Sequence, residues 1–187
     1  MFIEVIPMVR IDMMERVVDI PQGVSVDIKE NLISVSGKKG KITRKFIHPK
    51  VKMVIKDGNV YVNCPNPKRK EMGLVGTWAS HVQNMVNGVQ NGFHYKLRII
   101  FSHFPIKTSV KGNELVIENF LGERFPRRAK ILEGVTAKIS GEIINLEGIN
   151  KEMVGQTAAN IEKATIVKNY DTRVFQDGIY LTSRGDE

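Results

Sequence analysis

The 187-residue sequence contains one cysteine, Cys64, and a sole thiol excludes an internal disulfide and a cysteine-rich zinc site. No uninterrupted apolar run is longer than three residues, which excludes a membrane-spanning helix. The first twenty residues mix acidic and basic side chains with apolar ones, so we expect no secretory signal. Hydrophobic residues make up 42% of the chain, enough to bury a core. These features predict a soluble protein of the cytoplasm, with one ordinary domain or two small ones.

The sequence also lacks the motifs of common enzymes. No phosphate-binding Gly-x-x-x-x-Gly-Lys-Ser/Thr, no His-Glu-x-x-His and no Gly-x-Ser-x-Gly occurs. The four histidines show no metal-ligand spacing, and the carboxylates are not paired around glycines. Cys64 precedes a proline and is expected to be a small buried residue rather than a nucleophile. We therefore predict that the chain is not an enzyme and holds no cofactor or metal.

Acidic residues are missing from two long stretches, between Glu30 and Asp57 and from Met72 to Asn113, in a chain of net charge +8. Basic residues cluster in both stretches and in a third group. The first stretch holds Lys38, Lys39, Lys41, Arg44, Lys45, Lys50, Lys52 and Lys56, and the second holds Lys96, Arg98, Lys107 and Lys111. The third group is Arg124, Arg127, Arg128 and Lys130. A basic excess can serve solubility alone. Clustered like charges repel one another unless a polyanion neutralises them, and a phosphate backbone is the commonest such partner.

The first ninety residues read as strands followed by a helix. Apolar and polar residues alternate over residues 24–28, 32–35 and 51–55, with Asn, Asp and Gly between the runs, which is the pattern of β-hairpins. The period then changes: Asn66-Pro67 is a plausible helix start, and the helix is expected to stop near Asn87-Gly88. Its apolar face recurs every three or four residues, at Met72, Val75, Ala79, Val82, Val86 and Val89.

The second half repeats this plan, and it ends in a helix that starts at Asn150. The residues from Val75 to Val82 align with those from Val154 to Ile161 at an offset of 79. Because strands, turns and helix follow in the same order on both sides, we interpret the chain as a duplication. The predicted fold class is α+β, with two tandem related domains, each a small antiparallel-rich sheet packed on one main helix. We place the domains at residues 1–92, including an N-terminal extension of residues 1–16, and at residues 93–187.

The segment Gly37-Lys38-Lys39-Gly40 matches the Gly-x-x-Gly loop of KH domains, which contacts nucleic-acid phosphates. That loop joins two helices, whereas strand-like residues flank this one, so the KH interpretation fails on context. A strand-connecting turn with two lysines facing phosphate remains. Phe93 and Tyr95 lack the paired aromatic pattern of an RRM sheet and are expected in the core.

Two segments of the second domain are candidate RNA contacts. Residues 124–130 place basic side chains around the stiff Phe125-Pro126 pair, although a solvated turn explains this segment equally well. Residues 168–180 interleave aromatic and basic side chains, and Gly178 would permit a close approach of the backbone to RNA. Aromatic, basic and glycine residues together suit folded or single-stranded RNA, where stacking and phosphate contacts share one surface.

Three long stretches carry a family resemblance: SHVQNMVNGVQNGFHYKLRIIFSHFPI (80–106), ENFLGE (118–123) and ATIVKNYDTRVFQDGIY (164–180). Over about residues 17–180 the chain resembles large-subunit ribosomal protein six in its archaeal and eukaryotic branch, numbered nine in the older eukaryotic scheme. The resemblance implies two related α+β domains and no catalytic role. It implies a structural constituent of the large subunit that binds its rRNA near the sarcin–ricin loop and the stalk base, where translation GTPases dock. Neighbouring ribosomal proteins are the other implied partners.

Carried over by position, the resemblance makes the second domain the main rRNA-binding domain. The implied contacts of the C-terminal segment are Lys168, Tyr170, Arg173, Phe175, Gly178 and Tyr180. A second group follows the ENFLGE turn: Arg124, Arg127, Arg128 and Lys130. A third group in the first domain is Lys38, Lys39, Lys41 and Arg44. Net charge runs against this ranking, because residues 1–93 carry 14 basic and 8 acidic side chains and the rest carries 14 and 12. A free-standing RNA-binding regulator or chaperone is the alternative.

Overall fold

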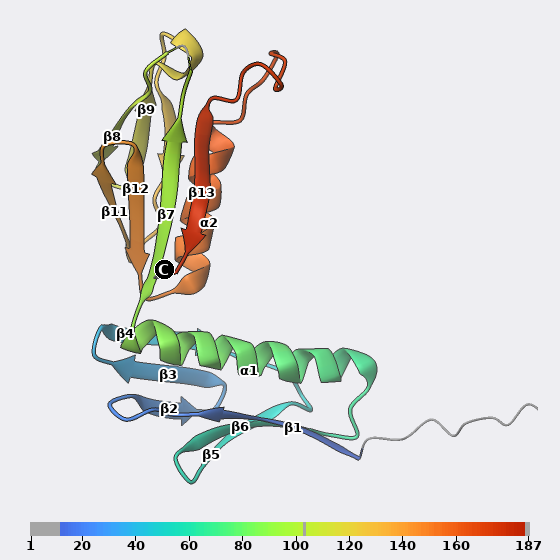
Figure 1. Cartoon of the computed structure of the whole chain (residues 1–187). Helices are drawn as coiled ribbons and strands as arrows, with labels where there is room; N and C mark the ends of the chain where they lie inside the picture. Colours follow the sequence, from blue (N-terminus) through green and yellow to red (C-terminus); the bar gives the residue numbers. More distant parts are fainter. Residues whose placement is uncertain (1–11, 103, 186–187) are drawn as a thin grey trace, which may run out of the picture. The chain divides into compact units, whose positions relative to one another are not determined.

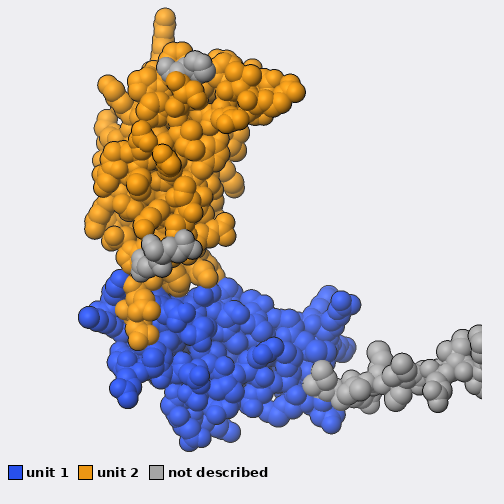
Figure 2. All heavy atoms as spheres, in the orientation of Figure 1, with its two compact units in different colours: residues 1–89 blue, residues 90–187 orange. Residues whose placement is uncertain are grey.

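The computed structural model describes residues 12–102 and 104–185. The chain folds into two compact units, residues 1–89 and 90–187, which are coloured separately in Figure 2. Each unit has its own hydrophobic core. Within the described residues, no helix is both long and apolar enough to cross a membrane.

Unit 1 consists of two three-stranded antiparallel sheets and one long helix (Figure 1). The strand orders are β1-β6-β5 and β2-β3-β4. The elements are β1 (Met13–Asp19), β2 (Ser25–Lys29), β3 (Leu32–Gly37), β4 (Gly40–Lys45), β5 (Lys52–Lys56), β6 (Asn59–Pro65) and α1 (Arg69–Gln90). Strand β1 starts inside the predicted N-terminal extension, so residues 13–16 belong to the folded unit. The other predicted extension residues, 1–11, lie outside the described residues.

The core of unit 1 follows the predicted periodicities. Alternate residues of β3 and β6 are fully buried, as the hairpin pattern requires. The predicted helix stripe is buried at Val75, Val82, Val86 and Val89. Two large residues, Trp78 and Met85, complete the buried face of α1, whereas Met72 and Ala79 are half-buried at its border. Cys64 is buried, as expected.

Both ends of α1 differ from the sequence prediction. At the start, Asn66 has a positive φ of 45°, and the amide of Met72 donates to the carbonyl of Lys68. The Glu71 carboxylate reaches back to the Lys68 amide, which places the N-cap at Lys68 rather than at Asn66. At the other end, the helix runs past Gly88 to Gln90. There the carbonyl of Val89 accepts a hydrogen bond from the amide of Lys39, 2.9 Å away, which satisfies one of the carbonyls that a helix end leaves without an intrahelical partner.

Unit 2 has a four-stranded sheet of order β11-β12-β7-β13, a three-stranded sheet of order β10-β9-β8, and one helix. Its elements are β7 (Phe93–Ile100), β8 (Lys107–Lys111), β9 (Glu114–Glu118), the 3-10 helix η1 (Phe120–Gly122), β10 (Arg127–Lys130), β11 (Val135–Ser140), β12 (Ile143–Gly148), α2 (Lys151–Ala164) and β13 (Gly178–Arg184). Helix α2 begins as predicted, since the side chain of Asn150 accepts a hydrogen bond from the Glu152 amide. Tyr95 is a core residue and Phe93 packs against it, as expected.

The sheet orders support the predicted duplication. β1-β6-β5 corresponds to β7-β12-β11, and β2-β3-β4 corresponds to β8-β9-β10, with a helix after the sixth strand in each unit. The helices match in burial at the predicted offset of 79, because Val75 and Val82 of α1 correspond to the buried Val154 and Ile161 of α2. The predicted α+β class with two tandem related domains is confirmed. In each domain, however, the strands divide between two sheets. Unit 2 also adds β13, which pairs with the free side of β7.

Candidate nucleic-acid interface

The two candidate segments of unit 2 lie at one end of the unit. One is the connection between β9 and β10, residues 119–126, which carries η1; the other, residues 165–177, joins α2 to β13 (Figure 1). We call them the β9–β10 loop and the tail loop.

Arg127 joins these two loops. Its Nε lies 2.8 Å from Oε2 of Glu123, and its Nη2 lies 2.6 Å from Oε1. Nη1 donates to the carbonyls of Ala164 and Ile166, at 2.9 and 3.0 Å. The guanidinium also lies 4.2 Å from the ring centroid of Phe120. Arg127 was predicted to contact phosphate, but its guanidinium donates its hydrogen bonds to acceptors within unit 2, at the C-terminal end of α2 and in the β9–β10 loop.

The hydrogen bonds from Arg127 hold the pKa of Glu123 below its usual value. A carboxylate that stays ionised at neutral pH keeps the bidentate contact intact. The carbonyl of Ala164, the last residue of α2, carries the partial negative charge of a helix end, which a cation also stabilises, whereas the carbonyl of Ile166 belongs to the tail loop. Arg127 thus acts as a positioning residue for the β9–β10 loop and for the start of the tail loop.

The remaining basic residues of this group have solvent-facing side chains. Residues 127–130 form strand β10 rather than a loop, so alternate side chains point to opposite faces. Arg128 is 67% exposed and lies 3.5 Å from Glu114, a contact of little energy at that exposure. Arg124 and Lys130 are exposed as well. Three of the four predicted cations are therefore placed where a phosphate backbone could reach them.

A tight turn shapes the tail loop. The Asp171 carboxylate accepts hydrogen bonds from the Arg173 amide and from its Nε and Nη2 atoms, at 3.0, 3.1 and 2.9 Å. The Asp171 carbonyl accepts from the amides of Val174 and Phe175. The ion pair lowers the pKa of Asp171 and raises that of Arg173. Arg173 is thus exposed but partly neutralised, which leaves Lys168 as the unpaired cation of this loop among the described residues.

Aromatic rings line the tail loop. Tyr170 and Phe175 contact each other with ring centroids 4.8 Å apart, and the Tyr170 ring is about half exposed. Tyr180, the last residue of the predicted segment, is 44% exposed, and its hydroxyl donates to the carbonyl of Gln176. Exposed rings beside cations fit the stacking surface that the sequence predicted.

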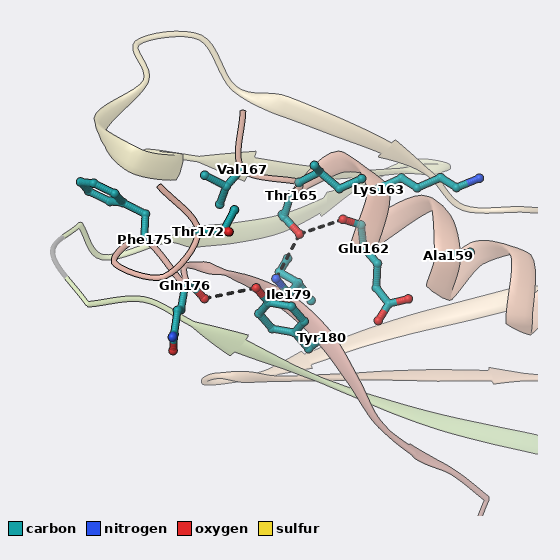
Figure 3. A pocket seen from close by; sticks show the side chains of 11 residues that line it. Ala159, Glu162, Lys163, Thr165, Val167, Thr172, Phe175, Gln176, Ile179 and Tyr180 are labelled. Atoms are coloured by element: carbon teal, nitrogen blue, oxygen red, sulfur yellow. Dashed lines mark hydrogen bonds between the residues drawn. The ribbon is translucent and has the colours of Figure 1, made fainter. Parts of the chain in front are cut away.

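The tail loop is fixed at both ends. The Thr165 hydroxyl accepts a hydrogen bond from the Ile179 amide at 3.0 Å, and Glu162 accepts one from the Leu181 amide at 2.9 Å. At the other side Asp177, fully buried, accepts from the Ser102 amide with one carboxylate oxygen. An open pocket of about 390 Å³ lies between the end of α2 and the loop, with Phe175 and Gln176 on its wall (Figure 3). These bonds hold the loop against β13 and α2.

Gly178 serves a purpose other than the ones proposed from the sequence. It begins β13 in an extended backbone that pairs with Ile100, so it is not required for a positive φ. A Cβ at this position would lie 2.9 Å from Cε2 of Tyr180 and 3.0 Å from Cζ and the hydroxyl oxygen. Because Gly178 has no side chain, the Tyr180 ring can pack against the backbone of β13 at this position. Gly178 itself is buried, which keeps its backbone from direct contact with a ligand.

The basic turn of unit 1 has the predicted form. Lys38 and Lys39 connect β3 to β4 as a two-residue turn, with both side chains exposed. Lys41 is exposed on β4, whereas Arg44 is half-buried, 3.4 Å from Nε2 of His81 and 5.6 Å from the ring centroid of Phe46. By the duplicated topology this turn corresponds to the β9–β10 loop of unit 2. The same connection therefore carries a basic group in both units.

Sequence reasoning missed the residues that hold this interface in place. Glu123 lay in the ENFLGE stretch that carried the resemblance, but nothing marked it as the partner of Arg127. Glu162 was hidden among the solvent-facing residues of a helix. Within the described residues, no group of three or more His, Cys, Asp or Glu side chains is placed to hold a metal ion. Fold and surface together define a two-domain α+β protein with a basic, aromatic end on unit 2 suited to a polyanion.

Comparison with known proteins identifies the family. The family model described as Ribosomal protein L6 matches residues 20–92 and 104–178, one segment in each unit. Two archaeal relatives are both named "Large ribosomal subunit protein uL6". That of Methanococcus vannielii is 47% identical over 167 residues, covering 89% of this chain and 92% of the relative. That of Methanosarcina mazei is 46% identical over 169 residues, covering 90% and 96%.

The chain belongs to the ribosomal protein L6 family. The family resemblance drawn from the sequence, including its archaeal branch, is confirmed. Family membership also supports the prediction that the chain is a structural protein rather than an enzyme. The match begins at residue 20, so strand β1 lies outside the region that the family model covers.

Proposed function

We propose that the chain is a structural constituent of the large ribosomal subunit of the cytoplasmic ribosome, and that it binds large-subunit rRNA. Membership in the ribosomal protein L6 family, with relatives named as large-subunit proteins, is the observation that carries this proposal. Its binding partners are the rRNA and neighbouring large-subunit proteins.

The main rRNA contact in this proposal is the basic end of unit 2. Arg124, Arg128 and Lys130 come from the β9–β10 loop and β10, and Lys168 comes from the tail loop. Arg127 holds these two loops together, so one backbone could meet cations from both. Neutralising phosphates releases counterions, which predicts an affinity that falls steeply with salt. The Tyr170 and Phe175 rings add shape-dependent contacts.

The second domain, residues 93–187, is therefore the proposed main rRNA-binding domain despite its smaller net charge. Affinity depends on the cations that touch phosphate and not on the charge of the whole domain. The turn at Lys38 and Lys39, with Lys41 and Arg44, is proposed as a weaker contact in unit 1. From the family resemblance we further propose that the protein lies near the sarcin–ricin loop and the stalk base, next to the docking site of translation GTPases.

A salt titration of rRNA binding tests this proposal. The full chain is bound to large-subunit rRNA in the presence of excess transfer RNA, and the dissociation constant is measured over a range of salt concentrations. The double variant Arg128→Ala/Lys168→Ala should bind more weakly, and its slope of log K against log salt should fall by about 0.7–0.9 for each lost phosphate contact. Lys52→Ala, an exposed cation of unit 1 outside the proposed contacts, is the matched control.

Equal slopes for the double variant and the wild type would overturn the proposed surface. A chain that prefers transfer or messenger RNA to rRNA would favour the free-standing regulator or chaperone instead. Release of labelled RNA fragments by the purified chain would contradict the assignment as a structural protein.

A further inference from the structure

The four-stranded sheet of unit 2 has an outer face whose cations are not among the contacts proposed above. Its inner face carries the apolar core residues of β7, β12 and β13, on which α2 packs. Strand alternation and register place a different set of residues on the outer face, half-buried or exposed: His94, Lys96, Arg98, Lys138, Ser140, Ile143, Asn145, Glu147, Tyr180 and Thr182. We call this set the outer sheet face.

Tyr180 forms a flat aromatic platform on this face. Its ring lies over Gly178, where any Cβ would come within about 3.0 Å of the ring atoms. The hydroxyl is held by the Gln176 carbonyl at 3.3 Å (Figure 3). One side of the ring is thus fixed against the strand, and 44% of the residue is exposed. A ring fixed in this way loses little conformational freedom when a planar group stacks on it.

Two cations on β7 lie beside this platform. Arg98 pairs in register with Tyr180, and Lys96 lies two residues further along the same strand. Among the described residues, neither side chain has an ion-pair or hydrogen-bond partner. Both line a surface hollow of about 440 Å³ together with Thr182 and Ile143. The two positive charges are therefore not neutralised within the unit.

The acidic residues of this region leave that charge uncompensated. The Glu147 carboxylate lies 3.4 Å from Nζ of Lys138 and 3.8 Å from Nδ1 of His94, so its ion pair is with Lys138 and not with Lys96 or Arg98. Glu142, at the β11–β12 turn, also lines the hollow, but it forms no ion pair with Lys96 or Arg98 among the described residues. An exposed aromatic ring with two adjacent cations matches how proteins hold single-stranded RNA, by base stacking and phosphate neutralisation.

We propose that the outer sheet face of unit 2 is a second RNA-binding surface, on which an unpaired base stacks on Tyr180 and the adjoining phosphates contact Arg98 and Lys96. This inference rests on the proposed rRNA function and extends it from the tail loop, whose pocket Tyr180 also lines, to the cations of β7 in the neighbouring hollow. Tyr180, at the end of the tail loop, connects the two surfaces. An RRM-like use of the sheet thus comes from β13, because Tyr95 is a core residue and Phe93 packs against the core.

Substitutions on this face, bound as full chains to large-subunit rRNA, test the inference. Tyr180→Leu should weaken binding about tenfold, the loss of one stacked base, while Tyr180→Phe keeps the ring and should stay within about twofold of the wild type. Arg98→Ala should weaken binding and lower the salt slope by about 0.7–1. Because Arg98 makes no side-chain bond to other described residues, this variant should melt like the wild type.

The outcomes separate this inference from the proposed function. If Arg98→Ala and Tyr180→Leu bind rRNA as the wild type does, while Arg128→Ala/Lys168→Ala binds weakly, the outer sheet face is not an RNA surface and the rRNA function stands. If those two variants bind rRNA normally but fail to join the large subunit, the face binds a protein and the inference is overturned. If the wild type shows no preference for rRNA over transfer RNA, the proposed function itself fails.

Discussion

The guanidinium of Arg127 donates two hydrogen bonds to the carboxylate of Glu123, with donor–acceptor distances of 2.8 and 2.6 Å. The same side chain reaches the carbonyls of Ala164 and Ile166. One arginine therefore sets the distance between two loops that are far apart in the sequence. Arg127 could either position the two loops or bind phosphate itself, and these two roles predict different effects of its removal on stability and on RNA binding.

Arg127→Ala should lower the unfolding free energy by about 1–3 kcal/mol, because it leaves a carboxylate, the last carbonyl of α2 and a carbonyl of the tail loop without their donor. Urea unfolding measures this change. Arg128→Ala, on the next and far more exposed position, should stay within about 0.5 kcal/mol of the wild type. The positioning role is contradicted if Arg127→Ala leaves stability unchanged but reduces the salt slope of rRNA binding.

The contact should also depend on pH. Because hydrogen bonds from Arg127 lower the folded-state pKa of Glu123, its stabilisation is complete above the unfolded carboxyl pKa of about 4.3 and is lost as the pH falls through the folded value. The unfolding free energies of the wild type and Glu123→Gln should differ at neutral pH and converge in acid. Subtracting the variant's curve cancels the titration of Asp171, whose pKa is also lowered. A difference that does not change with pH would show that Glu123 is not the ionised partner.

Two glycines of unit 1 should respond to alanine in opposite directions. A Cβ on Gly37 would lie 2.8 Å from a methyl group of Val89 and 3.0 Å from its carbonyl oxygen, where the β3–β4 turn meets the end of α1. Gly37→Ala should therefore cost about 1–3 kcal/mol of stability. Gly76 has open space around it inside α1, so Gly76→Ala should stabilise by about 0.5–1 kcal/mol. Thermal unfolding of both variants checks this, and a tolerated Gly37→Ala would mean that the turn is not tightly seated on α1.

Gly178, the first residue of β13, allows a double-mutant test. Gly178→Ala should displace the Tyr180 ring, with a loss of stability below about 1.5 kcal/mol, because the atoms it meets belong to a side chain that can swing aside. In a Tyr180→Leu background most of that loss should vanish, giving a coupling of about 0.5 kcal/mol or more. An equal loss of stability in both backgrounds would show that glycine is needed at position 178 for the backbone conformation and not for the packing of the Tyr180 ring.

Much of the fold could be predicted from the sequence, since period-2 and period-3.6 patterns reflect local burial. The helix start at Asn150 and the turn at Lys38 and Lys39 follow from local chemistry and were correct. Helix α1 ends two residues beyond the predicted Asn87-Gly88, where the Val89 carbonyl accepts a hydrogen bond from Lys39, a contact fifty residues away that local patterns do not reveal. Strand β13 was hidden because its pairing with β7 is a long-range contact.

The candidate site divides in the same way. Its segments could be found from composition and family resemblance, and residues such as Lys168 and Arg128 are exposed as expected. The role of each side chain could not be found, because it depends on which partner lies within reach. Arg127 and Arg128 are neighbours of the same chemical type, yet one is bound to Glu123 and the other faces solvent.

The most direct test of the central claim is cofractionation of the protein with ribosomal subunits in a sucrose gradient at moderate and high salt, combined with crosslinking. The account predicts that the protein sediments with the large subunit, and that residues 124–130 and 168–180 crosslink to rRNA around the sarcin–ricin region. Sedimentation as a free protein, or crosslinks mainly to messenger RNA, would contradict it while leaving the two-unit α+β fold intact.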